Sequence, residues 1–513
     1  MPVYELGALN TTALAAPDVY IQKVPPRTLY INGVPTDILG MVGIGSWGPV
    51  NASILATPDT FGPVTVRGHD LATAIAVSAQ NGAQNIRAVR VTDGTDAAAS
   101  AAILDVTTPT AGTGLTLTAF YTGTVGNTLN AAVATGTKAN TYKLTIQRPN
   151  YTAEVFDNIA GTGAALWSAM VSAVNNGQSG IRGPSRLCAA TIGTSIAAPD
   201  TTKTYTLAGG SDGAATITDT TLLGTDGTTP ATRTGMYALR GSGAQVLNLI
   251  EQDTPTDWPT IVAFAESEGM YAVVADAAGA DYATTSSDLD TAGADDPALK
   301  VMVGDWVYWL DTVNGVQRLL SPATFVAAEI AATAPHLSSL NKPLAGAIGT
   351  QRTSQNQPYS LAEIGAVATD RLDVVTNPCP GGHYFGCRTG RNASSDPTRN
   401  GDNYTRLTNY IALTLAASYG WVIGQPQTPD LRRQAKSSME SFLATLEAQG
   451  MIGDPNGGAA FSVVLDSTNN PASRVALGYM QADVQVKYLG IVWFFLVNLE
   501  GGQSVTVQIP NAA

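Results

Sequence analysis

Three side chains that can bind zinc lie in one short stretch of the sequence. Cys379, His383 and Cys387 are spaced four residues apart in CPGGHYFGC. Two thiolates and one imidazole could supply three ligands, the number that catalytic zinc sites use. The cysteines do not form a close pair, however, and the spacing suggests no fourth ligand. A Pro-Gly-Gly turn with buried thiols is the favoured interpretation, and the sequence leaves zinc binding open.

A serine in a glycine-rich stretch could act as a nucleophile. Gly209-Gly210-Ser211-Asp212-Gly213 contains the G-x-S-x-G pattern of hydrolases. A nucleophilic serine in this pattern needs a helix directly after it, but residues 214–221 are rich in threonine and unfavourable for a helix. The histidines that follow are His336 and His383. The sequence favours a structural turn here.

Two further patterns lack residues that their ligand sites need. Residues 43–48 (GIGSWG) spell GxGxxG, but no helix is predicted directly after them to face a dinucleotide. Asp288, Asp290 and Gly293 suggest a calcium loop, but alanine and leucine occupy two positions that would have to donate oxygen. We therefore predict no cofactor, and we interpret residues 284–297 as a polar loop.

Composition and charge restrict the classes of function. The chain has 513 residues, 44% of them hydrophobic, which is enough for several domains with buried cores. Its net charge of −13 argues against a nucleic-acid partner, because phosphate binding needs a basic surface. We also expect no membrane binding and no signal peptide. The 3 cysteines suit a reducing compartment, so we expect folding in a cytoplasm.

The end of the chain has the clearest strand patterns. Between Met480 and Tyr488 apolar and polar residues alternate, as in a strand with one buried face. Residues 491–497 (IVWFFLV) are apolar throughout, which predicts a central strand. A last strand has no successor to pair with, so we expect a neighbouring subunit to cover its edge. The predicted inter-subunit residues are Val484, Val486 and Tyr488 in the sheet and Val505, Val507 and Ile509 in the arm.

The middle of the chain alternates between strand and helix patterns, which predicts a doubly wound α/β layer. The expected helices are 236–252, 258–267 and 322–333, and the expected strands are 271–275 and 301–310. Earlier in the chain we expect strands at 38–44, 86–91, 115–119 and 142–147, and helices at 71–80 and 166–174.

Two helices are predicted near the carboxyl end, at 405–418 and 429–449. The second has Thr428 as its N-cap, Pro429 as its first residue and Gly450 as its stop. Its polar face carries three cations, Arg432, Arg433 and Lys436. They form either a solvated face or an electrostatic dock for an acidic partner.

Several motifs occur in an order and spacing that resemble one known family. The turn from Val42 to Val50 and the segment from Asn81 to Val91 are similar to the amino-terminal domain of contractile-tail sheath proteins. A more specific family signature, A-x-x-x-G-x-x-G-N-x-L, is matched at Ala119, Gly123, Gly126, Asn127 and Leu129. The resemblance spans most of the chain and is weakest between residues 210 and 345.

The resemblance implies a multidomain protein of the α/β and α+β classes. Its parts would be an extended arm (1–16), an amino-terminal sheath domain (17–106), an inserted β-rich domain (107–205), a doubly wound domain similar to subtilisin but without catalysis (206–395), a carboxy-terminal sheath domain (396–502) and a second arm (503–513).

The resemblance also implies a structural function rather than catalysis. A sheath subunit would form hexameric rings that stack into a helical sheath in a virion tail, assembled in the host cytoplasm. Its partners would be the inner tail tube, facing Arg432, Arg433 and Lys436, and baseplate and tail terminator proteins. Two alternatives remain: a non-contractile shell or surface-assembly protein and, less favoured, a hydrolase that uses the α/β domain.

Overall fold

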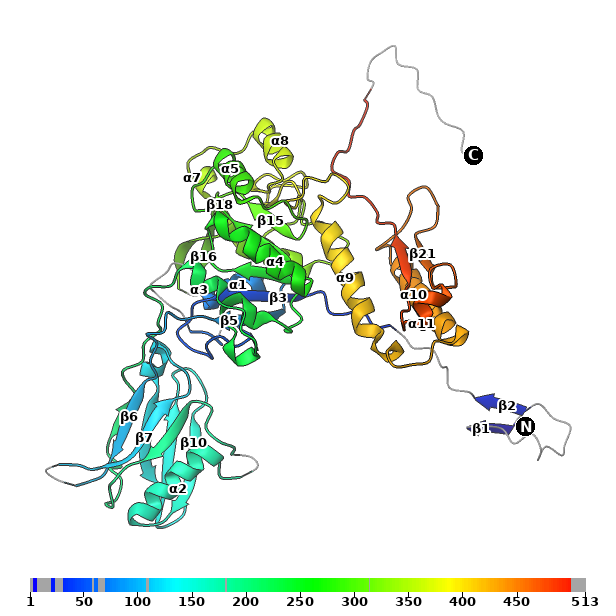
Figure 1. Cartoon of the computed structure of the whole chain (residues 1–513). Coiled ribbons are helices and arrows are strands. Elements are labelled where there is room, and N and C mark those ends of the chain that lie inside the picture. Colours follow the sequence, from blue (N-terminus) through cyan, green and yellow to red (C-terminus); the bar gives the residue numbers. More distant parts are fainter. Residues whose placement is uncertain are drawn as a thin grey trace. The chain divides into compact units, whose positions relative to one another are not determined.

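A computed structural model describes residues 3–6, 20–23, 31–57, 60–62, 70–107, 110–179, 182–312 and 314–499 (Figure 1). The chain divides into two compact units. One combines Met1–Val34 with Tyr410–Gly490, and the other combines Pro35–Asn409 with Ile491–Ala513. No helix in the described ranges is both long and apolar enough to cross a membrane.

The larger unit is built on a six-stranded sheet with the strand order β15-β14-β13-β3-β5-β4. All neighbouring strands in it are parallel except the pair β4 and β5. The strands are β3 (Ile38–Gly43), β4 (Ile54–Leu55), β5 (Asn85–Arg90), β13 (Val246–Leu249), β14 (Tyr271–Ala275) and β15 (Leu299–Met302).

Helices cover both faces of this sheet (Figure 1). Alternate residues of β3 belong to different cores: Leu39 and Met41 pack with α1 and α6, and Val42 packs with α4 and α5. This alternation follows from the two-residue period of a strand. The helices are α1 (Leu71–Gln80), α4 (Trp258–Glu268), α5 (Tyr282–Ala292) and α6 (Pro322–Ala332).

Two smaller sheets with the strand orders β10-β9-β8-β12 and β11-β7-β6 share a core with α2. Trp167 of α2 is fully buried in this core, and its indole Nε1 donates to the Ala197 carbonyl. The elements are β6 (Ser100–Leu104), β7 (Thr113–Ala119), β8 (Asn130–Thr135), β9 (Thr141–Gln147), β10 (Glu154–Ala160), α2 (Gly163–Asn176), β11 (Cys188–Ile192) and β12 (Thr204–Thr206).

The rest of the larger unit consists of short elements around the main sheet. They are α3 (Asp219–Leu223), β16 (Val307–Asp311), β17 (Val316–Leu320), β18 (Ala347–Thr350), α7 (Gln351–Ser354), α8 (Leu361–Thr369), β19 (Val375–Thr376), β20 (Gly386–Cys387) and the first part of α9 (Asp402–Ser418).

The smaller unit holds the second long helix and two separate pairs of strands. In α10 (Pro429–Ala448), Thr428 Oγ1 accepts a hydrogen bond from Leu431 N at 3.1 Å, and Gly450 follows with a φ of +70°. The other elements are α11 (Ala472–Ala476), the antiparallel pair β21 (Phe461–Val464) and β22 (Asp483–Val486), and the parallel pair β1 (Val3–Leu6) and β2 (Tyr20–Lys23).

Most of the predicted elements are confirmed, with shifts of a few residues at their ends. The predicted helix at 236–252 is wrong. Gly241 and Gly243 have φ values of +71° and +78°, and Val246–Leu249 is a buried strand of the parallel sheet. A short apolar run buried on both faces has no period that distinguishes a strand from a helix.

Two more predictions in this region need correction. Residues 284–297 are not a loop throughout, because α5 covers Tyr282–Ala292; Asp281 caps its start and Gly293, with a φ of +66°, ends it. The predicted strand at 301–310 is two strands, β15 and β16, with a turn in which Trp306 N donates to the Gly304 carbonyl.

Candidate assembly interface

The strand pair β21–β22 is the clearest candidate for pairing with another chain. Its register pairs Phe461 with Val486 and Val463 with Val484. Val484, Val486 and Tyr488 are half-buried, while the polar residues between them are exposed, so the predicted alternation is confirmed. Helix α10 packs against β21.

The strand itself is shorter than the sequence pattern indicates. β22 ends at Val486, and Tyr488 forms an isolated antiparallel β-bridge with Ile452. Beyond the strand, Lys487 N donates to the Ala460 carbonyl at 2.8 Å, and Lys487 Nζ lies 2.6 Å from Asp454 Oδ2. These contacts hold the chain close to the pair after β22 ends.

Among the described strands, no third strand joins this pair. A two-stranded sheet is marginally stable by itself, and each outer edge presents backbone N–H and C=O groups to any extended segment that can reach it. The pair β21–β22 therefore has the geometry of a sheet that accepts added strands.

The segment Ile491–Leu499 is not the central strand that its sequence predicts. Its residues form no strand, and six apolar side chains are largely exposed. Phe495 is 84% exposed and Leu496 is 88% exposed. A central strand needs a partner strand on each side, and none of the described strands pairs with this segment. The predicted arm residues Val505, Val507 and Ile509 lie outside the described residues.

The three cations of α10 are less available than the sequence suggests. Arg433 is paired with Asp430, one turn earlier, and Lys436 Nζ lies 3.7 Å from Glu440 Oε1. Arg432 is half-buried and donates to Gln427 Oε1 at 3.2 Å. Acidic side chains of α10 therefore pair with two of the three cations. Binding of an acidic partner by this face stays a prediction.

The residues that suggested catalysis or metal binding have structural contacts. Cys379 and Cys387 are buried, whereas His383 is exposed. Cys379 Sγ donates a hydrogen bond to the Thr376 carbonyl at 3.3 Å. Burial raises the pKa of both the Cys379 and the Cys387 thiol. Within the described residues, no three His, Cys, Asp or Glu side chains are grouped so that they could hold a metal. Ser211 pairs in a single bridge with Ala97, and no helix follows until Asp219.

The glycine-rich motifs meet around one arginine, Arg90 of β5. Its side chain is fully buried. Its guanidinium donates to the carbonyls of Gly48, Thr122 and Asp212 at 3.0, 2.7 and 3.1 Å. Three segments that are distant in sequence are thereby joined at one side chain.

The family signature around residues 119–129 contributes to the same junction. Asn127 Nδ2 donates to the Gly210 carbonyl at 2.9 Å, and its Oδ1 accepts from Gly210 N at 2.7 Å. Gly123 has a φ of +124°, and a Cβ there would lie 2.0 Å from the Ser46 carbonyl oxygen. These residues hold the turn against its neighbours.

The fold is similar to that of several solved structures. No family model matches the sequence, and no curated protein matches it. Among solved structures, a sheath tail protein from Desulfitobacterium hafniense is 18% identical with a TM-score of 0.55, over 88% of this chain and 94% of that chain. A sheath tail protein from Listeria innocua is 15% identical with a TM-score of 0.57, over 85% and 90%.

An assembled structure is also similar. The helical sheath of the anti-feeding prophage in its contracted state is 10% identical with a TM-score of 0.54, over 95% of this chain and 99% of that chain. The mixed α/β fold with several sheets is thus the fold of contractile tail and injection-system sheath proteins, as the sequence resemblance implied.

Proposed function

We propose that this chain is the structural subunit of a contractile tail sheath. The observation that carries the proposal is the likeness of fold to sheath proteins over almost the whole chain. Subunits would polymerise helically around an inner tail tube, as hexameric rings stacked on one another. Contraction would drive the tube through the host envelope. In this proposal the protein is not an enzyme.

Strand exchange is the proposed link between subunits. No described strand pairs with the outer edge of β21 or of β22, and a strand added there would gain main-chain hydrogen bonds along its length. The arms at 1–16 and 503–513 would come from two different neighbours. An interface that joins two different surfaces propagates as an open helix, which is the geometry of a sheath.

Contraction requires subunits that move as rigid bodies while staying connected. Arms that are linked only through added strands can act as hinges between such bodies. The extended sheath would be kinetically trapped, and contraction would release the free energy stored in it. The baseplate and tail terminator proteins would bind the two ends of the sheath, and the inner tube would lie against the face with Arg432, Arg433 and Lys436. The sheath would be part of a virion tail and would assemble in the host cytoplasm.

Electron microscopy of the purified protein tests this proposal. We expect long hollow helical tubes from the full chain, and only rings or monomers from a chain truncated after Gly502. Val507→Asp should also block tubes, because it places a charge in the proposed strand core, whereas Gln508→Asp on the opposite face should not. Closed or planar assemblies from the full chain would instead favour a non-contractile shell protein.

A further inference from the structure

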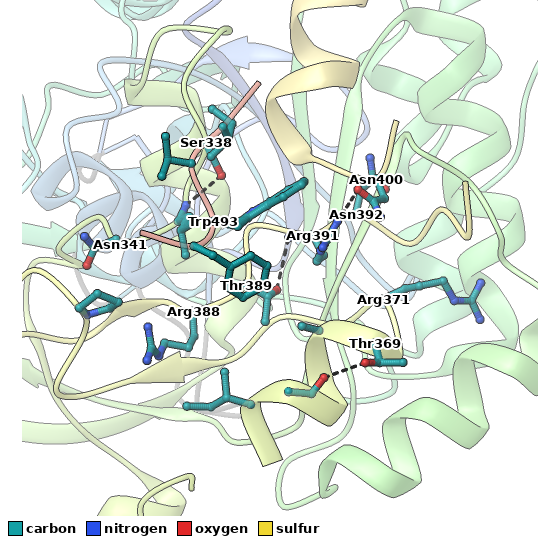
Figure 2. A pocket seen from close by; sticks show the side chains of 18 of the residues that line it. Ser338, Asn341, Thr369, Arg371, Arg388, Thr389, Arg391, Asn392, Asn400 and Trp493 are labelled. Carbon is teal, nitrogen blue, oxygen red and sulfur yellow. Dashed lines mark hydrogen bonds between the residues drawn. The ribbon is translucent and has the colours of Figure 1, made fainter. Parts of the chain in front are cut away.

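A pocket of about 1090 Å³ lies in the larger unit beside the exposed apolar segment. It is lined by residues 491–495, by residues of α8 and by the loop around residues 388–400, and Figure 2 shows Trp493, Arg388, Arg391 and Asn400 around it. Leu340, Leu361 and Phe494 give it apolar surface. A pocket of this size can hold several side chains of a binding segment.

The charges that line this pocket are all positive. Lys342, Arg371, Arg388 and Arg391 are among the lining residues, and none of the lining residues is an Asp or Glu. Arg371 is neutralised by Asp290 at 2.6 Å, outside the lining. For Lys342, Arg388 and Arg391, no acidic partner lies within 4.0 Å in the described part of the chain. Three uncompensated cations in one pocket are notable in a protein with a net charge of −13.

The buried polar atoms without partners in this pocket are both donors. Arg388 Nε and Trp493 Nε1 are buried and have no hydrogen-bond acceptor. The Trp493 ring centroid lies 3.9 Å from the Arg391 guanidinium carbon, and Arg391 also donates to Asn400 (Figure 2). Both donors belong to side chains that line the pocket, so the lining offers N–H groups and positive charge and no acidic group.

We propose that this pocket receives an Asp or Glu side chain, next to an apolar side chain, from a second copy of this chain. The carboxylate accepts hydrogen bonds from Arg388 and pairs with Lys342, and the apolar side chain packs on the wall of Leu340, Leu361 and Phe494. Charge complementarity favours a second copy, since the chain carries 40 acidic residues against 27 basic ones. The inference rests on the proposed function, because the second copy is supplied by assembly.

Zero-length cross-linking of assembled tubes tests this contact. Isotopically light and heavy monomers are mixed before assembly, and a carbodiimide then joins amines to carboxylates that touch. We expect Lys342 to form amide links between light and heavy chains. Lys342→Arg should remove the link and leave assembly intact, because the charge stays and the reactive amine is lost.

A double variant tests whether the pocket matters for assembly. Lys342→Gln with Arg388→Gln should slow tube growth about tenfold. The matched control, Lys138→Gln, changes an exposed lysine outside the pocket and should have no effect. Unfolding curves equal to wild type show that both variants are folded.

Each outcome has a distinct meaning. Tubes in which Lys342 is unlinked, or linked only within one chain, overturn the inference and leave the sheath function standing. A double variant that assembles at the wild-type rate overturns it as well. Failure of the wild-type chain to form tubes overturns the sheath function, and the inference with it.

Discussion

Ionisable side chains at the centre of the larger unit form a buried network. Lys300 Nζ lies 2.6 Å from Asp373 Oδ2 and 3.4 Å from Asp402 Oδ2, and all three side chains are at most 2% exposed. Lys300 also donates to the Arg391 carbonyl at 3.1 Å, next to the pocket described above. Removing one member of such a network leaves a buried charge without a partner, which typically costs about 3–5 kcal/mol. The network therefore fixes the position of the loop that carries Arg391.

Glu329, in α6 near this network, should make stability depend on pH. Burial raises its pKa from 4.5 to about 7, although Thr333 donates to its carboxyl group at 2.7 Å. Because the folded state binds this proton more tightly than the unfolded state, protonation of Glu329 stabilises the fold. This contribution is fully present below pH 4.5 and is lost as the pH rises through 7. At about 1.4 kcal/mol per pH unit, the loss reaches about 3 kcal/mol. Urea unfolding of wild type and Glu329→Gln should therefore diverge between pH 5 and pH 8, with the variant more stable at pH 8.

Glu363 is the control for this experiment, because its surroundings lower the pKa of its carboxyl group, whereas those of Glu329 raise it. Ser360 and Arg352 lower the pKa of Glu363 to about 2, so its carboxylate is ionised in the folded state throughout this range. Glu363→Gln should change stability nearly equally at pH 5 and pH 8. If wild type and Glu329→Gln have the same pH dependence, Glu329 does not titrate in the folded protein.

At the scale of elements, both the segment 491–499 and the pair β21–β22 lack further partner strands among the described residues. The segment has exposed apolar side chains and no partner strand among the described residues, and no described strand pairs with the outer edges of β21 and β22. Exposed apolar surface of this kind marks an interaction site. The sequence predicts a strand at 491–497, and no strand in the described part of the chain pairs with these residues.

Leu496→Lys tests this interpretation. Because Leu496 is 88% exposed, the substitution should change the free energy of unfolding of the monomer by less than about 0.5 kcal/mol. It should nevertheless prevent tube formation, because a buried lysine without a partner would be required in the assembled sheet. Asn498→Lys, also at an exposed position, is the control and should allow tubes. Tubes from Leu496→Lys would show that the segment stays exposed in the assembly.

At the scale of the whole molecule, the two units carry different candidate surfaces. The larger unit contains the α/β sheet, the β-rich part and the basic pocket, and the smaller unit contains the open strand pair and the basic face of α10. An acidic chain that presents local basic surfaces can bind other acidic surfaces, including those of its own copies.

Charge reversal on α10 tests the proposed contact with the inner tube. In the variant Arg432→Glu, Arg433→Glu and Lys436→Glu, we expect loss of co-sedimentation with assembled tube protein, because Asp430 and Glu440 would then add to the negative charge. Lowering the salt should strengthen binding of the wild type and not of the variant. Unchanged binding by the variant would place the tube contact elsewhere.

Elements with local signals could be predicted from the amino-acid sequence. Helix α10 is predicted from Thr428, Pro429 and Gly450, and the structure confirms Thr428 as its N-cap. The alternation from Val484 to Tyr488 likewise predicted which side chains are half-buried. Capping and periodicity depend on neighbours in sequence, so they can be read without a fold.

Features that depend on contacts between distant residues are seen only in the folded chain. Arg90 joins three glycine-rich segments, and no local pattern indicates that an arginine in a strand is fully buried. The pocket forms because Lys342, Arg388 and Trp493, from three separate segments, lie around one hollow. The strand at 246–249 was mistaken for a helix, since burial on both faces removes the period that would identify it.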